Sequence, residues 1–229
     1  MASLADKLAG KFIVFDGPDG SGKSTQLRLL AKHLSKLGAA VECVRDPGGT
    51  TVGDKIRQVL LDRDSGRISP MCETLLFMAS RAQLVHERIR PALAAGKVVL
   101  CDRFISATVA YQGAAGVDRQ TVLRLGEIAV GGLWPDLTII LDVDPETGMS
   151  RAGAPRRHGR GPRRAGRGQR SLFGDRLEAM DLGYHREVQR IFRELGRAYP
   201  GKVVHIDGNR APEDVLKDVI DAVGEALGQ

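Results

Sequence analysis

The sequence predicts a three-layer α/β/α sandwich around a five-stranded parallel sheet. Three observations predict it: short apolar runs of strand length, longer segments with helical periodicity between them, and polar clusters directly after the apolar runs. Strands that are apolar along their whole length are typical of parallel sheets covered by helices on both faces. The expected strands are residues 12–15, 41–44, 98–100, 137–141 and 203–206, and the expected helices are residues 24–36, 52–61, 70–95, 119–130, 175–198 and 212–227.

The length of 229 residues is enough for one substantial core, so we expect a single domain over residues 1–229, with residues 1–10 as an N-terminal extension. No apolar run approaches the roughly 18 residues of a membrane span. The first residues include Asp6 and lack the apolar segment of a secretory signal. We therefore expect a cytoplasmic protein that does not contact a membrane.

Cysteines and charge exclude further classes of protein. Cys43, Cys72 and Cys101 are an odd number at no metal-ligand spacing, which argues against a disulfide framework or a zinc site, and we expect all three to be buried. The formal net charge of +6 has a local origin, because residues 156–170 contain seven arginines and no acidic residue. We interpret the Arg- and Gly-rich residues 153–174 as a mobile loop.

A phosphate-binding loop is the clearest chemical signal. After the first strand comes Gly17, then four variable positions, and then Gly22, Lys23 and Ser24 at the start of a helix. The predicted nucleotide-binding residues are Gly17, Pro18, Asp19, Gly20, Ser21, Gly22, Lys23, Ser24 and Thr25. Backbone N–H groups and the helix N-terminus would hold the phosphates of ATP, while Lys23 reaches the β and γ phosphates and Ser24 ligates Mg²⁺. This loop predicts the P-loop nucleoside triphosphate hydrolase fold.

An acid at a neighbouring strand end should help to hold the metal ion. Asp102 and Asp142 both follow apolar strands, and ligands of open α/β sheets gather at such strand ends. Asp102 is favoured because Arg103 follows it directly, and an arginine suits a site that handles phosphate. The other interpretation of Asp142 is that it caps the helix near Glu146.

The type of enzyme follows partly by exclusion. A guanine-specifying Asn-Lys-x-Asp segment after a late strand is absent, which argues against a GTPase, and most motor or transport ATPases are larger. A small phosphotransferase remains. Arginines around the same cleft would then bind the acceptor phosphate bidentately, and the candidates are Arg81 and Arg103, with Arg45 as a weaker third.

Several segments, in order and at familiar separations over about residues 11–227, resemble the thymidylate kinase family. They are Asp19-Gly20 in the loop, residues 45–50 after the second strand, residues 77–81, Asp102-Arg103-Phe104 followed by Thr108 and Tyr111-Gln112-Gly113, and Pro135-Asp136-Leu137. The resemblance implies transfer of the γ-phosphoryl group of ATP to dTMP, giving ADP and dTDP, with Mg²⁺. It also implies a homodimer.

The resemblance further implies roles for four acceptor-side residues. Phe77 would stack on the pyrimidine ring, and it lies four residues before Arg81, on the same helical face. Thr108 would hydrogen-bond the thymine edge, and Tyr111 would crowd the 2′ position of the sugar. Asp19 would bind the sugar 3′-hydroxyl or a metal-bound water, because the following residue is Gly20 rather than the arginine of some family members. That substitution is typical of the bacterial type.

A lid would run over about residues 151–178 and deliver an arginine to the migrating phosphoryl group. The candidates are Arg151, Arg156 and Arg157, and the residues do not distinguish them. Lys23 and this arginine would neutralise the phosphoryl group, and no general base is needed because the dTMP phosphate is already an anionic nucleophile.

Two alternatives stay open. The enzyme could act on another nucleoside monophosphate, such as UMP or CMP. The arginine-rich residues 156–170 could add nonspecific nucleic-acid binding, which we disfavour because no aromatic residue occurs among them before Phe173.

Overall fold

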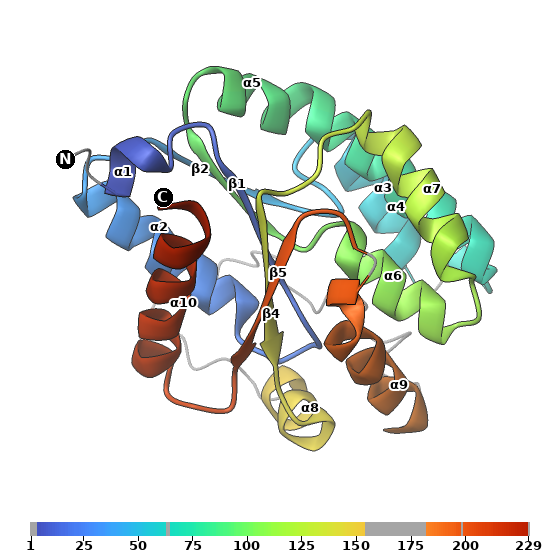
Figure 1. Ribbon diagram of the computed structural model, residues 1–229. Coiled ribbons are helices and arrows are strands. Elements are labelled where there is room, and N and C mark those ends of the chain that lie inside the picture. The colour runs from blue at the N-terminus through green and yellow to red at the C-terminus, as the bar shows by residue number, and fades with distance from the viewer. Residues whose placement is uncertain (1–3, 63–64, 154–181, 198, 229) are drawn as a thin grey trace, which may run out of the picture.

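The computed structural model describes residues 4–62, 65–153, 182–197 and 199–228. Within these ranges five strands form one sheet in the order β2-β3-β1-β4-β5, and every neighbouring pair is parallel (Figure 1). The strands are β1 (Phe12–Asp16), β2 (Val41–Arg45), β3 (Val98–Asp102), β4 (Leu137–Asp142) and β5 (Lys202–Asp207). All five coincide with the expected strands, and the predicted α/β fold is confirmed.

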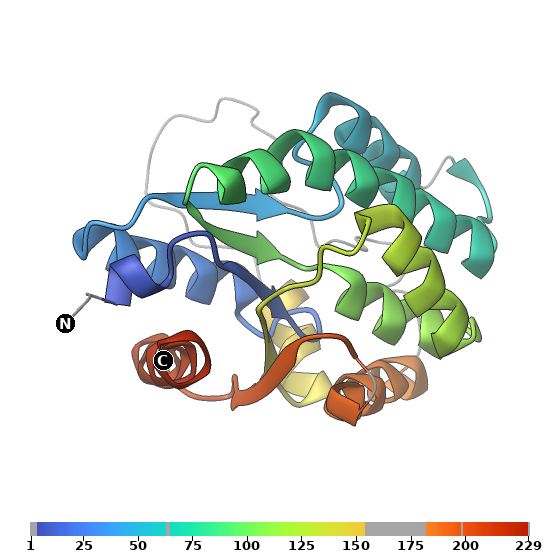
Figure 2. The ribbon, with the colours of Figure 1, turned by 45° about the horizontal axis from the view of Figure 1, so that its top comes forward.

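The sheet is covered on both faces, as its apolar strands require. Phe12 and Val14 of β1 belong to one buried cluster, and Ile13 and Phe15 belong to the other, because successive side chains point to opposite faces. The second cluster packs under α2 (Lys23–Lys36) and α10 (Pro212–Leu227), while the helices from α3 to α7 and α9 cover the first (Figures 1 and 2). The three layers of the predicted sandwich are therefore present.

The remaining helices and their bounds complete the fold. They are α1 (Leu4–Lys7), α3 (Thr51–Leu61), α4 (Pro70–Leu84), the π-helix η2 (Val85–Ile89), α5 (Arg90–Ala94), α6 (Ile105–Ala114), α7 (Arg119–Val130), α8 (Pro145–Gly153), α9 (Leu182–Arg193) and the 3₁₀-helix η3 (Leu195–Arg197). The expected helix over residues 70–95 is present but includes the π-helical turn. Pro91 lies just after this turn and has no N–H to donate to the carbonyl of Glu87, which accounts for the local change of pitch.

The helices α1 and α6 were not expected from the sequence. In α6 all residues from 105 to 112 are buried, so the helix has no polar face to reveal its period. The helix α8 is the one near Glu146 that the second interpretation of Asp142 assumed. The expected helix over residues 175–198 is described only from Leu182, where α9 begins, and its first residues lie outside the described ranges.

The cysteine prediction was partly wrong. Cys101 on β3 is buried, but Cys43 and Cys72 are exposed. Cys43 lies on β2, an edge strand of the sheet, and Cys72 lies in the first turn of α4. No helix among the described residues is long and apolar enough to cross a membrane.

Candidate active site

The carboxyl ends of the strands bring charged side chains together. The strands β1 to β5 end at Asp16, Arg45, Asp102, Asp142 and Asp207. The strand β1 lies between β3 and β4, so the chain leaves it toward one edge of the sheet and later returns to its other side. Such a switch point leaves a crevice outside the strand ends, and ligands bind there in open α/β sheets.

The loop between β1 and α2 has the backbone geometry of an anion site. Gly22 precedes α2 with a φ of 97°, a conformation that favours glycine, and no side chain caps the first turn of the helix. A Cβ placed on Gly22 would meet no described atom within 4 Å. The first turn of α2 therefore has no side-chain cap, and a phosphate can accept the hydrogen bonds of its N–H groups.

Lys23 is folded onto the loop itself. Its Nζ donates to the carbonyl oxygens of Gly17 at 3.1 Å and Pro18 at 2.7 Å, and the side chain is 6% exposed. Burial, together with the nearby charge of Arg103, lowers the pKa of Lys23 to about 8. The ammonium group of Lys23 thus donates its hydrogen bonds to loop carbonyls, in the place of the phosphate oxygens that it would contact in a complex with ATP.

Ser24 and Asp102 are in direct contact. The Ser24 hydroxyl donates to Asp102 Oδ2 at 2.6 Å, and Asp102 Oδ1 is buried and accepts no hydrogen bond from the described residues. Hard oxygen atoms of this kind are the ligands that Mg²⁺ takes. This pair, with its orphaned carboxylate oxygen, fits a magnesium ion, although no group of three or more acidic, His or Cys ligands occurs in the described part.

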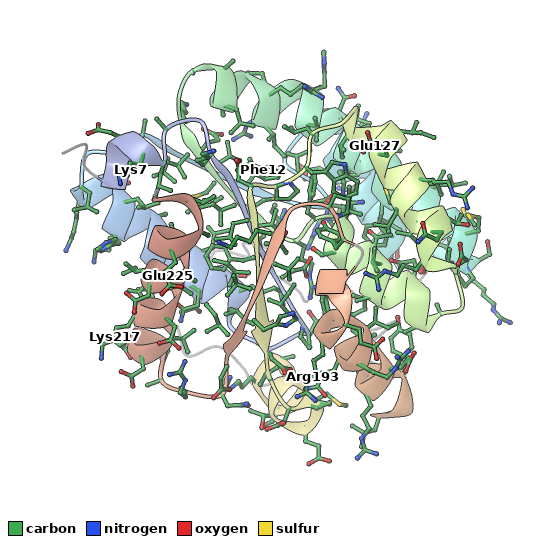
Figure 3. The ribbon with its side chains drawn as sticks, in the orientation of Figure 1. Lys7, Phe12, Glu127, Arg193, Lys217 and Glu225 are labelled. Carbon is green, nitrogen blue, oxygen red and sulfur yellow. The ribbon has the colours of Figure 1, made fainter. Side chains whose placement is uncertain are left out.

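Asp142 has other partners. Its two oxygens accept hydrogen bonds from Gln189 Nε2 at 2.9 Å and from Arg193 Nε at 2.6 Å, both on α9. Arg193 is labelled in Figure 3. The side chain therefore joins α9 to the end of β4. These hydrogen bonds are to α9 rather than to α8, so the interpretation of Asp142 as a cap near Glu146 finds no support.

Arg103 joins the loop to α6. It is 1% exposed, and its φ of 71° makes it the one non-glycine residue with positive φ in the described ranges. Its guanidinium donates to Asp16 at 3.2 Å, to Asp19 at 2.7 Å and to the Tyr111 hydroxyl at 3.2 Å. The left-handed backbone is unfavourable for a residue that carries a Cβ, and it turns the chain between β3 and α6.

The pKa values of Asp19 and Asp16 are shifted in opposite directions, although both carboxylates contact Arg103. Burial alone would raise the pKa of Asp19, but the charges of Arg103 and Lys23 lower it below its ordinary value, and Tyr111 adds a hydrogen bond at 3.2 Å. Burial raises the pKa of Asp16, which also accepts hydrogen bonds from Gly17 N and Ser106. Asp16 was not among the sequence candidates, although its place at the end of β1 could have indicated it.

Arg81 lies between Asp46 and α6. Its Nε donates to Asp46 at 2.5 Å, and its Nη2 donates to the Phe104 carbonyl at 3.0 Å and to Thr108 Oγ1 at 3.1 Å. The side chain is 1% exposed. None of these partners belongs to the phosphate loop, and the role of Arg81 as a phosphate clamp stays a prediction. Its contact with Thr108 instead groups it with the residues expected at the thymine edge.

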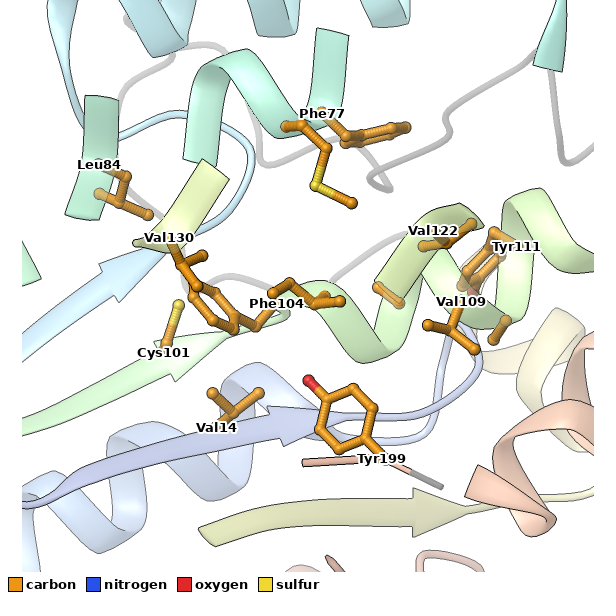
Figure 4. Close-up of a cluster of buried hydrophobic side chains, with 14 of the residues drawn as sticks. Val14, Phe77, Leu84, Cys101, Phe104, Val109, Tyr111, Val122, Val130 and Tyr199 are labelled. Atoms are coloured by element: carbon orange, nitrogen blue, oxygen red, sulfur yellow. The ribbon is translucent and has the colours of Figure 1, made fainter. Parts of the chain in front are cut away.

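Phe77 and Tyr111 belong to the same buried cluster. Figure 4 shows Phe77 on α4 above the start of α6, with Phe104 and Val109 below it. Phe77 lies one turn before Arg81, as expected, and is 5% exposed. Burial raises the pKa of Tyr111 well above its ordinary value, so its hydroxyl keeps its proton and can donate to Asp19.

Arg45 and Arg57 form a second cationic pair. A Cβ on Gly48 would lie 3.6 Å from Arg45 Nη2 and 3.5 Å from Arg57 Cδ, so both side chains pack around this glycine. Burial and the charge of Arg45 lower the pKa of Arg57 to about 10. Two guanidinium groups held this close favour an anion between them. Arg57 was missed because a single arginine in a predicted amphipathic helix is usually a surface residue.

The lid arginines are only partly described. Arg151 lies in the last turn of α8, and its guanidinium donates to the carbonyls of Gly208 at 2.8 Å and Asn209 at 3.1 Å. Arg156, Arg157 and most of the expected lid lie outside the described residues. The contacts of Arg151 hold the segment after β5, next to the phosphate loop, because Gly208 packs against Ser21 O.

The comparisons agree with this geometry. The thymidylate kinase family model matches residues 15–219. The chain is 44% identical to a thymidylate kinase of Exiguobacterium sp. over 97% of its length and 98% of the relative's, and 42% identical to one of Deinococcus radiodurans over 94% and 97%. The crystal structure of thymidylate kinase from Ehrlichia chaffeensis superposes with a TM-score of 0.72 at 28% identity, covering 94% of this chain and 98% of the other. The chain therefore belongs to the thymidylate kinase family.

Proposed function

We propose that the protein transfers the γ-phosphoryl group of ATP to dTMP and releases ADP and dTDP. One observation carries the proposal: Arg103 contacts both Asp19 of the phosphate loop and Tyr111 of α6. The donor site on the loop and the acceptor site between α4 and α6 are therefore adjacent. Direct transfer requires this adjacency, because the two phosphates must approach in line.

On the donor side, Lys23 moves from the carbonyls of Gly17 and Pro18 to the β and γ phosphates. The ammonium group then neutralises the charge on the migrating phosphoryl group. Ser24 and Asp102 would hold the magnesium ion. When bound, Mg²⁺ supplies a divalent charge that offsets the negative charge of the phosphate oxygens.

On the acceptor side, three guanidinium groups surround the phosphate of dTMP: those of Arg103, Arg45 and Arg57. This set keeps two of the expected clamps and replaces Arg81 by Arg57. The phosphate is already anionic at neutral pH, so the chain needs to position it rather than remove a proton. The closeness of Arg45 to Arg57, which lowers the pKa of Arg57, supports this assignment.

The thymine base would stack on Phe77, with its C4 carbonyl toward Arg81 and Thr108. An arginine carries only hydrogen-bond donors, so a carbonyl suits it and an amino group does not. Tyr111 would crowd the sugar 2′ position, and Asp19 would accept the 3′-hydroxyl. An arginine of residues 151–178 would neutralise, together with Lys23, the negative charge of the transferring phosphoryl group. Arg151, Arg156 and Arg157 stay candidates for it.

A homodimer through α3 and α4 fits the surface. Several large apolar side chains are exposed on these two packed helices: Val52, Val59, Met71 and Leu75, each 41% to 49% exposed. A second copy of the chain that covered them would remove this apolar area from water. Light scattering of the wild type and Leu75→Glu tests this directly, since a dimer that the charge does not weaken would place the interface elsewhere.

The test of the reaction is an ADP-release assay with dTMP, dUMP, UMP, CMP and AMP. We expect kcat/KM to be highest for dTMP. Faster turnover of UMP or CMP would overturn the acceptor assignment, and no contact in the described residues favours either. The predictions of a cytoplasmic protein, a single domain and no nucleic-acid partner stay predictions.

A further inference from the structure

Two hydrogen bonds cross between α4 and α6. Arg81 bonds Thr108, and Gln112 Nε2 donates to Glu73 Oε2 at 3.3 Å. The later residue of α4 meets the earlier residue of α6, so the two helices run antiparallel. Glu73, Phe77 and Arg81 are spaced four apart and occupy one side of α4. Phe77 therefore lies midway between the two crossing bonds.

The Gln112–Glu73 pair is buried and incomplete. Gln112 is 1% exposed and Glu73 is 7% exposed. The carbonyl oxygen of the amide, Gln112 Oε1, is buried and accepts no hydrogen bond from any described residue. A buried acceptor without a donor is unfavourable, so native proteins satisfy nearly all of them. An orphaned acceptor one turn from Thr108 on α6 points to a ligand that supplies the donor.

The carboxylate of Glu73 fixes which way the amide faces. An ionised carboxylate only accepts hydrogen bonds, so it binds the NH₂ end of the amide and excludes the carbonyl end. Glu73 lies in the first turn of α4, where the positive end of the helix dipole favours a charged carboxylate. The amide of Gln112 is thereby held with Oε1 turned away from Glu73.

We propose that Glu73 is a positioning residue that makes Gln112 present only an acceptor to the acceptor base. Thymine and uracil carry an N–H at ring position N3 and can donate to Gln112 Oε1. Cytosine carries a bare nitrogen at N3, so two acceptors would meet and neither would be satisfied. Glu73 thus selects bases with N3–H against cytosine without touching them. The inference rests on the proposed function, in which the base lies beside Phe77.

The sharpest test compares dUMP with dCMP, because these two acceptors differ only at ring positions 3 and 4. Glu73→Gln keeps the shape of the side chain but can also donate a hydrogen bond, so the amide of Gln112 becomes free to turn. We expect the ratio of kcat/KM for dUMP over dCMP to fall at least about tenfold. The KM for dTMP should rise several-fold, with kcat for dTMP and the KM for ATP little changed.

The chain offers a matched control on its surface. Gln83 Nε2 also donates to a glutamate, Glu87, at an exposed position of the same helical region. Glu87→Gln breaks the same type of pair and should leave the ratio unchanged. Glu73→Asp keeps an acceptor-only group, and its ratio should stay close to that of the wild type.

The double variant Glu73→Gln/Gln112→Glu transposes the pair. Its carboxylate at position 112 still offers only acceptors to the base, so the selectivity should return, which a purely structural role of Glu73 would not produce. An unchanged ratio in Glu73→Gln overturns the inference, as does an equal loss for all acceptors. If Glu73→Gln does not fold, the double variant tests the proposal instead, and a kcat/KM ratio for dUMP over dCMP near one contradicts it.

Failure of the proposed function can be told apart from failure of this inference, because the wild type would then not phosphorylate dTMP at all.

Discussion

The two halves of the site are built differently. The donor half consists of neighbouring residues in one loop, and it offers backbone N–H groups and the single charge of Lys23 to the ligand. The acceptor half is assembled from distant segments, and its buried side chains are already bonded to one another, as Arg81 is to Asp46 and Thr108. The charge of a lysine side chain can bind any polyphosphate. A set of buried side chains that are already hydrogen-bonded to one another fits only one ligand shape and one pattern of hydrogen bonds. Variants of the two halves should therefore fail in different ways.

The largest effect should come from the donor half. Lys23→Ala removes the charge that meets the transferring phosphoryl group, and we expect kcat to fall about 100- to 1,000-fold. Thermal unfolding should show a folded protein, because Lys23 bonds only loop oxygens. Lys217→Ala, at an exposed surface pair, is the control. A loss of less than tenfold for Lys23→Ala would contradict its assigned role.

In the acceptor half, Arg81→Lys should raise the KM for dTMP by about 10- to 100-fold and leave the KM for ATP unchanged. A lysine keeps the charge but cannot reach Asp46, Phe104 O and Thr108 together. Steady-state kinetics with each substrate varied in turn measures the separation. The exposed Arg88 serves for the control substitution Arg88→Lys. Equal changes in both KM values would break the distinction between the halves.

The two strand-end aspartates should separate in their response to magnesium. Asp102→Asn should raise the Mg²⁺ concentration for half-maximal activity about tenfold, because Asp102 binds Ser24 and has a free buried oxygen. Asp142→Asn should leave this concentration unchanged, since its partners are Gln189 and Arg193. A magnesium titration of both variants decides, and the reverse result would assign the metal to Asp142.

The last effect concerns pH and is small near neutral pH. The pKa of Lys23 in the free protein is about 8, and the protonated form binds phosphate. Below pH 8 the affinity for ATP should be steady, and above it the affinity should fall by up to about tenfold per pH unit as the proton is lost. Lys23→Arg keeps its charge and should show no such fall. Isothermal titration calorimetry from pH 7 to pH 9.5 measures both, and parallel slopes would exclude Lys23 as the titrating group.

The difference between the halves also explains what could be predicted from the sequence. The phosphate loop was predictable because its glycines, Lys23 and Ser24 are contiguous and their spacing is set by the phosphates. The five strands were predictable because each contains a short, mainly apolar run of strand length. The sequence reduced the candidates for the metal-binding carboxylate to Asp102 and Asp142. Only the structure shows that Asp102 contacts Ser24.

The acceptor half was harder for physical reasons. The sequence cannot show that Asp46 lies against Arg81, 35 positions away, and this ion pair is the reason why we propose Arg81 for the base rather than for the phosphate. The helix α6 was missed because it is buried on all sides and has no amphipathic period. Arg57 depends on contacts with other elements and has no local pattern that distinguishes it from an ordinary helix residue. Gln112 was named as part of the segment Tyr111-Gln112-Gly113, but its contact with Glu73 came only from the fold.

The internal ion pairs of Arg103 bear on how fast products leave. Its guanidinium is already held by Asp16 and Asp19, so in the proposed reaction an arriving phosphate would replace one anionic partner of the arginine by another. The net gain in free energy would then be a difference between two similar interactions, which would keep the affinity for nucleotides moderate. When dTDP departs, the carboxylates can take the arginine back at once. A kinase whose turnover is limited by product release would benefit from such a return partner.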